Sequence, residues 1–172
     1  MSDELKLATI LNPIIVKIQD YLETDMKIPL LEDSVEISDV ENITLKKNTV
    51  MIGTGGDVQL IVTFGYDDIL LDVLVDAFLY GEKVDESELL EVQESVCCEI
   101  ANTIIGNAIT NPYSNTLISI TPPILIREAK SFAKHKNSTI KVATIKTKFG
   151  DIQLSAVGPK EMFANKLNFK EL

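Results

Sequence analysis

Residues 87–111, SELLEVQESVCCEIANTIIGNAITN, are the stretch that decides the fold of this chain. On a helix of about 3.6 residues per turn, or roughly 100° per residue, its side chains separate into two opposed faces. The apolar face, which can be buried, holds Leu89, Val96, Ile100, Ile104 and Ala108. The polar face, within an arc of roughly 60°, holds Ser95, Glu99, Asn102 and Gly106. The sequence therefore predicts a long amphipathic helix whose polar side is the working surface.

Length and charge limit the class of protein. With 172 residues the chain can bury a core of its own, and we expect a single domain over 1–172, with a lead-in at 1–10 and an extension at 159–172. It has 26 Asp and Glu against 16 Lys and Arg, a formal net charge of −10. This charge repels nucleic acid and anionic membranes, so we expect neither as a partner. The absence of a secretion-signal pattern or an apolar run of ~20 residues predicts a cytoplasmic protein.

The cysteine and histidine content argues against metal and nucleophilic chemistry. Cys97 and Cys98 are adjacent within the predicted helix, where their side chains point about 100° apart and suit a structural disulfide poorly. We expect Cys97 in the core and Cys98 at its boundary. With these two cysteines and His135, which lies in a polar stretch, a Cys-His metal site or a His-dependent catalytic scheme is not expected.

The N-terminal part of the chain predicts one helix and one strand. Asn12 can supply a cap oxygen and Pro13 fits a first helical position, so the first helix is predicted to begin there. Apolar residues then recur at helical spacing up to Leu22. Residues 3–11 are left open as a turn or a separate helical piece. The signals weaken after residue 29, and one strand is predicted near residues 41–46.

Two hairpins and a second helix are predicted from turn signals. Residues 49–54 and 58–64 form strands around a turn with Gly55 and Gly56. Asp67 or Asp68 can cap the helix that follows, and Gly81 can end it. The predicted apolar face of that helix is Ile69, Leu70, Val73, Leu74 and Phe78. Residues 138–149 and 151–157 form the second hairpin, around the turn at 150–151.

The segment between the long helix and the second hairpin predicts an edge of the sheet. Residues 115–120 read as a strand, and Pro122 and Pro123 exclude a central ladder position, which indicates an edge or a bend. The basic stretch 127–137 is left open as a loop or a frayed helix. The tail from residue 159 is left open as a closing helix or a packed extension.

The predicted order of elements defines the fold class. A helix, a sheet segment, two helices and a second sheet segment predict an α+β domain in which helices cover one face of a largely antiparallel sheet. Parallel pairing stays open, because each helix could be a crossover. Edge strands invite pairing with a second copy, so we expect a homodimer.

Residues 94–108, ESVCCEIANTIIGNA, resemble the signature of the CheC/CheX/FliY family of chemotaxis phosphatases. In that signature Asp or Ser is followed by Glu, Asn and Gly at set spacings and by a proline some twenty residues on. Here the matching residues are Ser95, Glu99, Asn102 and Gly106, followed by Pro122 or Pro123. Residues 11–24 resemble the first helix of CheX-type proteins, and both hairpins come in the family's order. The single Glu-x-x-Asn points to the CheX type, whose members form homodimers, and the resemblance implies a CheC-like fold.

The resemblance also implies a chemistry. Such relatives hydrolyse the aspartyl phosphate of a CheY-like response regulator, so Asn102 would position the attacking water and Glu99 would pair with the regulator's lysine. Mg²⁺ would stay bound to the regulator, and the chain would need no cofactor or metal of its own. Phosphoryl transfer relies mainly on positioning and charge neutralisation, which an amide and a carboxylate can supply.

The sequence departs from the family's pattern after the prolines, where the basic stretch 127–137 stands in place of an expected glycine. This departure bears on how a regulator would dock. It keeps open an alternative function, a CheX-like dimeric module that binds its partner without hydrolysis.

Overall fold

The computed structural model describes residues 3–109, 117–128, 130–133 and 135–159. The helical elements run in chain order as α1 (Asp3–Asp20), the π-helical turn η1 (Tyr21–Asp25), α2 (Asp68–Phe78) and α3 (Leu89–Ile109). The strands are β1 (Leu30–Val40), β2 (Asn42–Thr44), β3 (Asn48–Gly56), β4 (Ile61–Tyr66), β5 (Ile118–Ile120), β6 (Ile124–Arg127), β7 (Ser131–Ala133), β8 (Ser138–Thr147) and β9 (Gly150–Pro159). The predicted tail lies outside the described residues.

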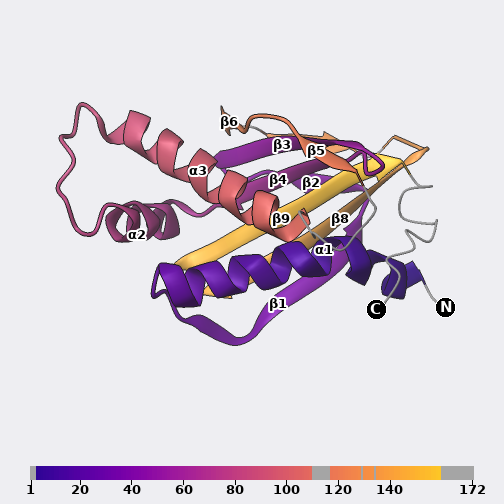
Figure 1. The fold of residues 1–172 in the computed structure, drawn as a ribbon, viewed down its shortest axis with the longest axis horizontal. Coiled ribbons are helices and arrows are strands. Elements are labelled where there is room, and N and C mark those ends of the chain that lie inside the picture. The colour runs from indigo at the N-terminus through magenta and orange to yellow at the C-terminus, as the bar shows by residue number, and fades with distance from the viewer. Residues whose placement is uncertain (1–2, 110–116, 129, 134, 160–172) are drawn as a thin grey trace.

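The fold is α+β, as predicted. The main sheet has the order β1-β8-β9-β4-β3-β5, with β6 also paired to β3, and its described pairings are antiparallel. Helices α1 and α3 lie side by side across one face of this sheet, and α2 lies beside the N-terminal half of α3 (Figure 1). A second sheet of two strands pairs β2 with β7. The long helix α3 therefore packs on the sheet and is flanked by α1 and α2.

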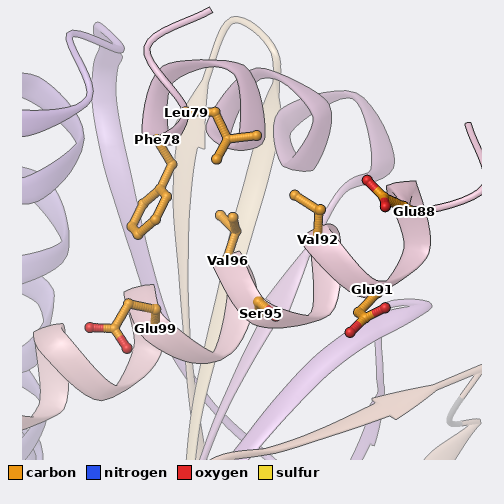
Figure 2. A pocket seen from close by; sticks show the side chains of 8 residues that line it. All are labelled: Phe78, Leu79, Glu88, Glu91, Val92, Ser95, Val96 and Glu99. Atoms are coloured by element: carbon orange, nitrogen blue, oxygen red, sulfur yellow. The ribbon is translucent and has the colours of Figure 1, made fainter. Parts of the chain in front are cut away.

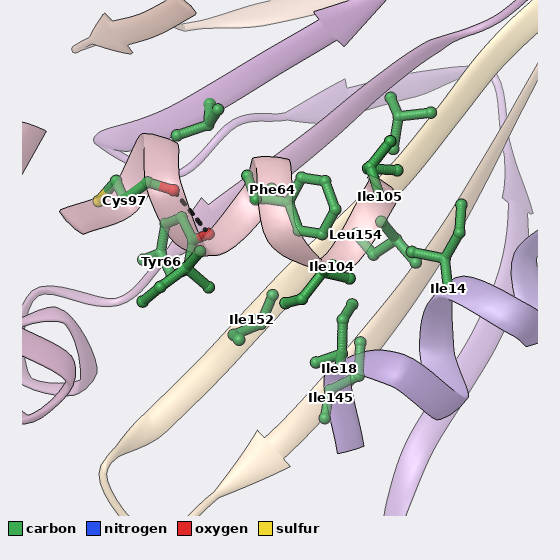
Figure 3. Packing of buried hydrophobic residues seen from close by; sticks show 14 of the residues in the cluster. Ile14, Ile18, Phe64, Tyr66, Cys97, Ile104, Ile105, Ile145, Ile152 and Leu154 are labelled. Carbon is green, nitrogen blue, oxygen red and sulfur yellow. Dashed lines mark hydrogen bonds between the residues drawn. The ribbon is translucent and has the colours of Figure 1, made fainter. Parts of the chain in front are cut away.

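The main core fills the space between the helices and the sheet. Strand residues alternate between the two faces, so every second side chain of β4, β8 and β9 points toward the helices. Phe64, Ile145 and Leu154 are fully buried there against α1 and α3 (Figure 3). The Tyr66 hydroxyl donates a hydrogen bond of 3.4 Å to the backbone carbonyl of Cys97, which ties β4 to α3. Burial on this scale holds α3 in a fixed orientation.

The opposite face of the sheet is covered by residues 42–47 and β7. A smaller core cluster joins this segment to β8 through Ile43, Leu45, Ile140 and Val142. The side chain of Lys46 packs over β4 at Gly65, where a Cβ would lie 3.1 Å from the Cβ of Lys46. The β2–β7 pair therefore lies on the side of the sheet away from α3.

The first helix begins earlier than predicted. α1 starts at Asp3 and contains Pro13 in its interior, so Asn12 is not its cap. Both residues are exposed, while Leu11, Ile14 and Ile18 are buried. The buried stripe runs through the proline, and its packing against the core outweighs the hydrogen bond that the proline removes.

The strand prediction between residues 29 and 48 was incomplete. Most of this segment forms the long strand β1, and only the short β2 lies within the predicted 41–46. β1 is an edge strand with an irregular register between Leu30 and Val35, and Asp33 has a φ of 52°. None of its side chains is fully buried, so it lacks the alternation that marks a half-buried strand.

The basic stretch is neither a plain loop nor a helix. Residue Arg127 ends β6, and Ser131–Ala133 form β7 against β2. Pairing with a distant strand decides this structure, which local propensity does not indicate. Pro122 and Pro123 lie in the link between β5 and β6 at the edge of the sheet, as predicted.

Both hairpins are confirmed, with one change in the first. Gly55 and Gly56 belong to β3 and pair with β5, so the connection to β4 runs through residues 57–60 and the second strand begins at Ile61. In α2 the predicted apolar face is also corrected, because Ile69 is 67% exposed. Its place in the core is taken by Leu71 and Val75.

Asp67 precedes α2, but its carboxylate does not cap the helix. It accepts hydrogen bonds from Lys46 Nζ at 2.6 Å and from the backbone N–H of Asp151 at 2.8 Å. These contacts lower the pKa of Asp67 against the opposing effect of burial, which is the largest single influence. Gly150, with φ 123°, lies against Asp67, where a Cβ would come within 2.8 Å. This junction joins the start of α2 to the turn between β8 and β9.

Candidate functional site

Helix α3 is anchored along one side. Its buried residues are Val96, Cys97, Ile100, Ala101, Ile104 and Ile105. Three of the predicted apolar positions, Val96, Ile100 and Ile104, are among them. Ala108 is only partly buried, and Leu89 is exposed, because it lies in the first turn of the helix. Cys97 is a fully buried core side chain, as predicted, and this burial raises the pKa of its thiol to about 12. Cys98 is half-buried at the boundary.

Polar contacts also hold the N-terminal half of α3 from both sides. Arg127 of β6 donates a hydrogen bond of 2.7 Å to the carbonyl of Leu90 and lies 3.7 Å from the carboxylate of Glu94. On the other side Gln93 donates to Asp72 of α2 at 3.0 Å. These contacts, added to the buried side, leave one face of the helix to solvent.

That face carries the predicted polar residues. Ser95 and Glu99 are exposed, and Asn102 and Gly106 are partly exposed. The hydroxyl of Thr103 donates to Glu99 Oε1 at 3.5 Å, a contact that the sequence did not indicate. A Cβ built at Gly106 would meet no atom of the described residues within 4 Å. The face presents a carboxylate and an amide one turn apart on a fixed support.

The end of the first helix borders this face. Tyr21 lies in η1, a π-helical turn, which is a form common at functional sites. Burial is the main reason that the pKa of Tyr21 is raised to about 12, and the charges of Asp25, Glu99 and Tyr80 add to it. Tyr21 is therefore a neutral hydroxyl beside Glu99 at physiological pH.

A pocket of about 540 Å³ lies between the end of α2 and α3 (Figure 2). Its lining residues are Phe78, Leu79, Glu88, Glu91, Val92, Ser95, Val96 and Glu99. Glu88 and Glu91 add carboxylates to the lining at the N-terminal end of α3, beyond Ser95 and Glu99 of the polar face. The sequence identified Ser95 and Glu99 but not this pocket, because the side chains that α2 contributes depend on how the two helices pack.

Other residues considered from the sequence lie on other elements. Pro122 and Pro123 are on the link between β5 and β6, and β6 contacts α3, while His135 is exposed near β8. Among the described residues, no group of three or more His, Cys, Asp or Glu side chains is placed to hold a metal ion. Within the described part of the chain, none of the helices is both long enough and apolar enough to cross a membrane.

An α+β domain with a Glu-x-x-Asn face on a helix supported by an antiparallel sheet belongs to the CheC/CheX class of folds. The family model described as chemotaxis phosphatase CheX matches residues 48–146, more than half of the chain. The protein is therefore a member of the CheX family.

Solved structures share this fold. The chemotaxis protein CheX of Desulfovibrio desulfuricans is 15% identical, with a TM-score of 0.71 over 86% of this chain and 97% of that chain. A putative chemotaxis protein of Desulfovibrio vulgaris Hildenborough is 17% identical, with a TM-score of 0.72 over 86% and 95%. The structure of a CheX-CheY-BeF3-Mg²⁺ complex of Borrelia burgdorferi is 18% identical, with a TM-score of 0.62 over 86% and 96%. No match was found among curated proteins.

Proposed function

We propose that the protein accelerates hydrolysis of the aspartyl phosphate of a CheY-like response regulator. The observation that carries this proposal is the pairing of Glu99 and Asn102 on the open face of a helix whose opposite side is buried in the core. Membership of the CheX family supports it, as does the fold shared with the CheX of the Borrelia complex that contains CheY, beryllofluoride and Mg²⁺.

In the proposed mechanism Asn102 enters the regulator's active site. Its amide oxygen and NH₂ hold a water molecule in line with phosphorus, so that the water attacks and the regulator's aspartate leaves. The charge on the transferred group is neutralised by Mg²⁺ and the lysine of the regulator. The chain then supplies only a fixed amide, which suits an acyl phosphate that is already reactive.

Glu99 has a different proposed role, which is to set the angle of approach. Its carboxylate would form a charge-assisted hydrogen bond with the regulator's active-site lysine. The contact from Thr103 limits the directions that the carboxylate can take. We assign Ser95 and Gly106 to the supporting surface, because both lie on the same side of α3 as Glu99 and Asn102. Pro122 and Pro123 would shape the edge nearest β6.

The alternative of binding without hydrolysis depended on the basic stretch 127–137. Within it, β7 pairs with β2 on the face of the sheet opposite α3, so this part does not cover Glu99 or Asn102. Arg127 contacts α3 at Leu90 and Glu94, on a different side of the helix from Glu99. The described part of the stretch therefore gives no reason to favour the alternative. The homodimer and the cytoplasmic location remain predictions.

Mixing the purified protein with phosphorylated CheY-like regulators tests the proposed function directly. We expect the phosphate to be released faster than the regulator's own decay, at substoichiometric amounts of the protein. Unchanged decay of every regulator from the same genome would contradict the proposal, while binding without faster decay would support the non-catalytic alternative.

Replacing Glu99 with alanine is expected to weaken association with the regulator about tenfold, because one charge-assisted contact is lost. Glu99 is exposed, so the thermal midpoint should stay close to that of the wild type. Titration of the variant with a regulator activated by beryllofluoride and Mg²⁺ measures the first effect, and circular dichroism the second. A variant that unfolds would show that Glu99 is structural.

A further inference from the structure

The pocket between α2 and α3 continues directly from the Glu-x-x-Asn face. Glu99 lines both, and Ser95 lies one turn before it on the same side (Figure 2). The floor of the pocket is apolar, formed by Phe78, Leu79, Val92 and Val96, and carboxylates stand at its rim, from Glu88, Glu91 and Glu99. We call this pocket the α2–α3 groove. Any protein that covers Glu99 also reaches the groove.

An exposed aromatic residue stands beside the groove. Tyr80 follows Leu79 directly, and its side chain is 96% exposed. Its backbone has a φ of 53°, which is uncommon for an aromatic residue, and the helix-ending contacts Tyr80 N–H to Ala77 O and Gly81 N–H to Asp76 O hold this turn. Strained backbone conformations and exposed aromatic side chains both concentrate at binding sites. The turn therefore presents Tyr80 to a partner at a cost in local stability.

The chemistry of the groove selects the kind of occupant. An apolar floor favours an apolar side chain, and three carboxylates at the rim favour Lys or Arg around it. A second copy that placed the same groove against this one would set the carboxylates of Glu88, Glu91 and Glu99 against each other. Lys and Arg flanking an apolar side chain are the complementary pattern.

We propose that the α2–α3 groove, with Tyr80 as an aromatic anchor, is the docking site for an apolar side chain flanked by Lys or Arg on the regulator's surface next to its active site. This assignment rests on the proposed function and adds a second contact to it. Glu99 and Asn102 act on the phosphorylated centre, and the groove selects which regulator is held there.

Direct binding tests this proposal. The probe is a CheY-like regulator activated by beryllofluoride and Mg²⁺, titrated into the full-length protein. Glu91→Lys and Tyr80→Ser are each expected to raise the Kd about tenfold, and the Glu91 variant should also lose much of the dependence of the Kd on ionic strength. The matched controls are Glu32→Lys, an exposed acid on β1, and Leu117→Ser, a 76% exposed apolar residue before β5. Both controls should leave the Kd unchanged.

The outcomes separate this proposal from the proposed function. Wild-type binding and phosphatase activity with unchanged affinity in both groove variants would overturn the groove assignment and leave the function intact. Failure of the wild-type protein to bind or dephosphorylate any regulator would overturn both. Groove variants that alter only self-association, measured by sedimentation, would assign the groove to a second copy and overturn the proposal.

Discussion

Replacing Asn102 with alanine is expected to reduce the acceleration of regulator dephosphorylation by about 100-fold or more. A methyl group cannot hold the attacking water, and loss of a single positioned polar group at a reaction centre has effects of this order. Asn102 is only partly buried and lies outside the core, so the free energy of unfolding should change by less than about 0.5 kcal/mol. Timed loss of phosphate from the regulator measures the activity, and urea unfolding measures the stability.

The matched control for this prediction is Asn107→Ala. Asn107 is an exposed asparagine on the same helix, outside the Ser95–Gly106 face, so its replacement tests for effects of amide loss that are not specific to the site. Its activity should equal that of the wild type. Equal decay rates with wild type and Asn102→Ala would remove Asn102 from the mechanism, whatever the binding data show.

Replacing Ile100 with alanine is expected to lower the free energy of unfolding by about 2–5 kcal/mol. Ile100 is fully buried next to Glu99 in the chain, on the side of α3 that packs on the core, and truncation leaves a cavity under the site. The measurement is the urea midpoint, with the slope of the transition checked for constancy.

Leu90→Ala is the control for the effect of leucine-sized truncation on the same helix. Leu90 is 62% exposed, and only its backbone carbonyl receives the Arg127 contact, so the loss should stay within about 0.5 kcal/mol. If Ile100→Ala were as mild as this control, α3 would not depend on its buried side, and the fixed placement of Glu99 and Asn102 would need another cause.

The parts of the fold that could be predicted are those in which local pattern and tertiary structure agree. The 138–157 hairpin and α3 have the periodicity and turn residues of their final structures. The start of α1 could not be predicted, because Asn12 and Pro13 have the residue types of a helix N-terminus. The helix nevertheless extends through them, because its buried side packs on the core. β1 and β7 were missed because they form through pairing with β8 and β2, to which local propensity adds little.

The site divides in the same way. The stripe of Ser95, Glu99, Asn102 and Gly106 follows from helical spacing alone, so its residues were identified from the sequence. The neutral Tyr21 hydroxyl and the apolar floor from Phe78 and Leu79 could not be identified, because they come from separate helices whose packing against α3 sets their position. Spacing within one helix predicts which of its residues share a face, but not which residues of other helices lie beside that face.

The topology of the sheet also decides at what stage of synthesis the Glu-x-x-Asn face gains a fixed support. Val40 pairs with Ile140 and Ile61 with Val157, so two of the strand pairings join residues roughly a hundred positions apart. β9 supplies Ile152 and Leu154 to the floor beneath α3, and it leaves the ribosome after α3 has been made. During synthesis the Glu-x-x-Asn helix is therefore made before the strand on which it packs. A chain cut short before β9 would carry every residue of the signature and have no rigid surface on which to present it.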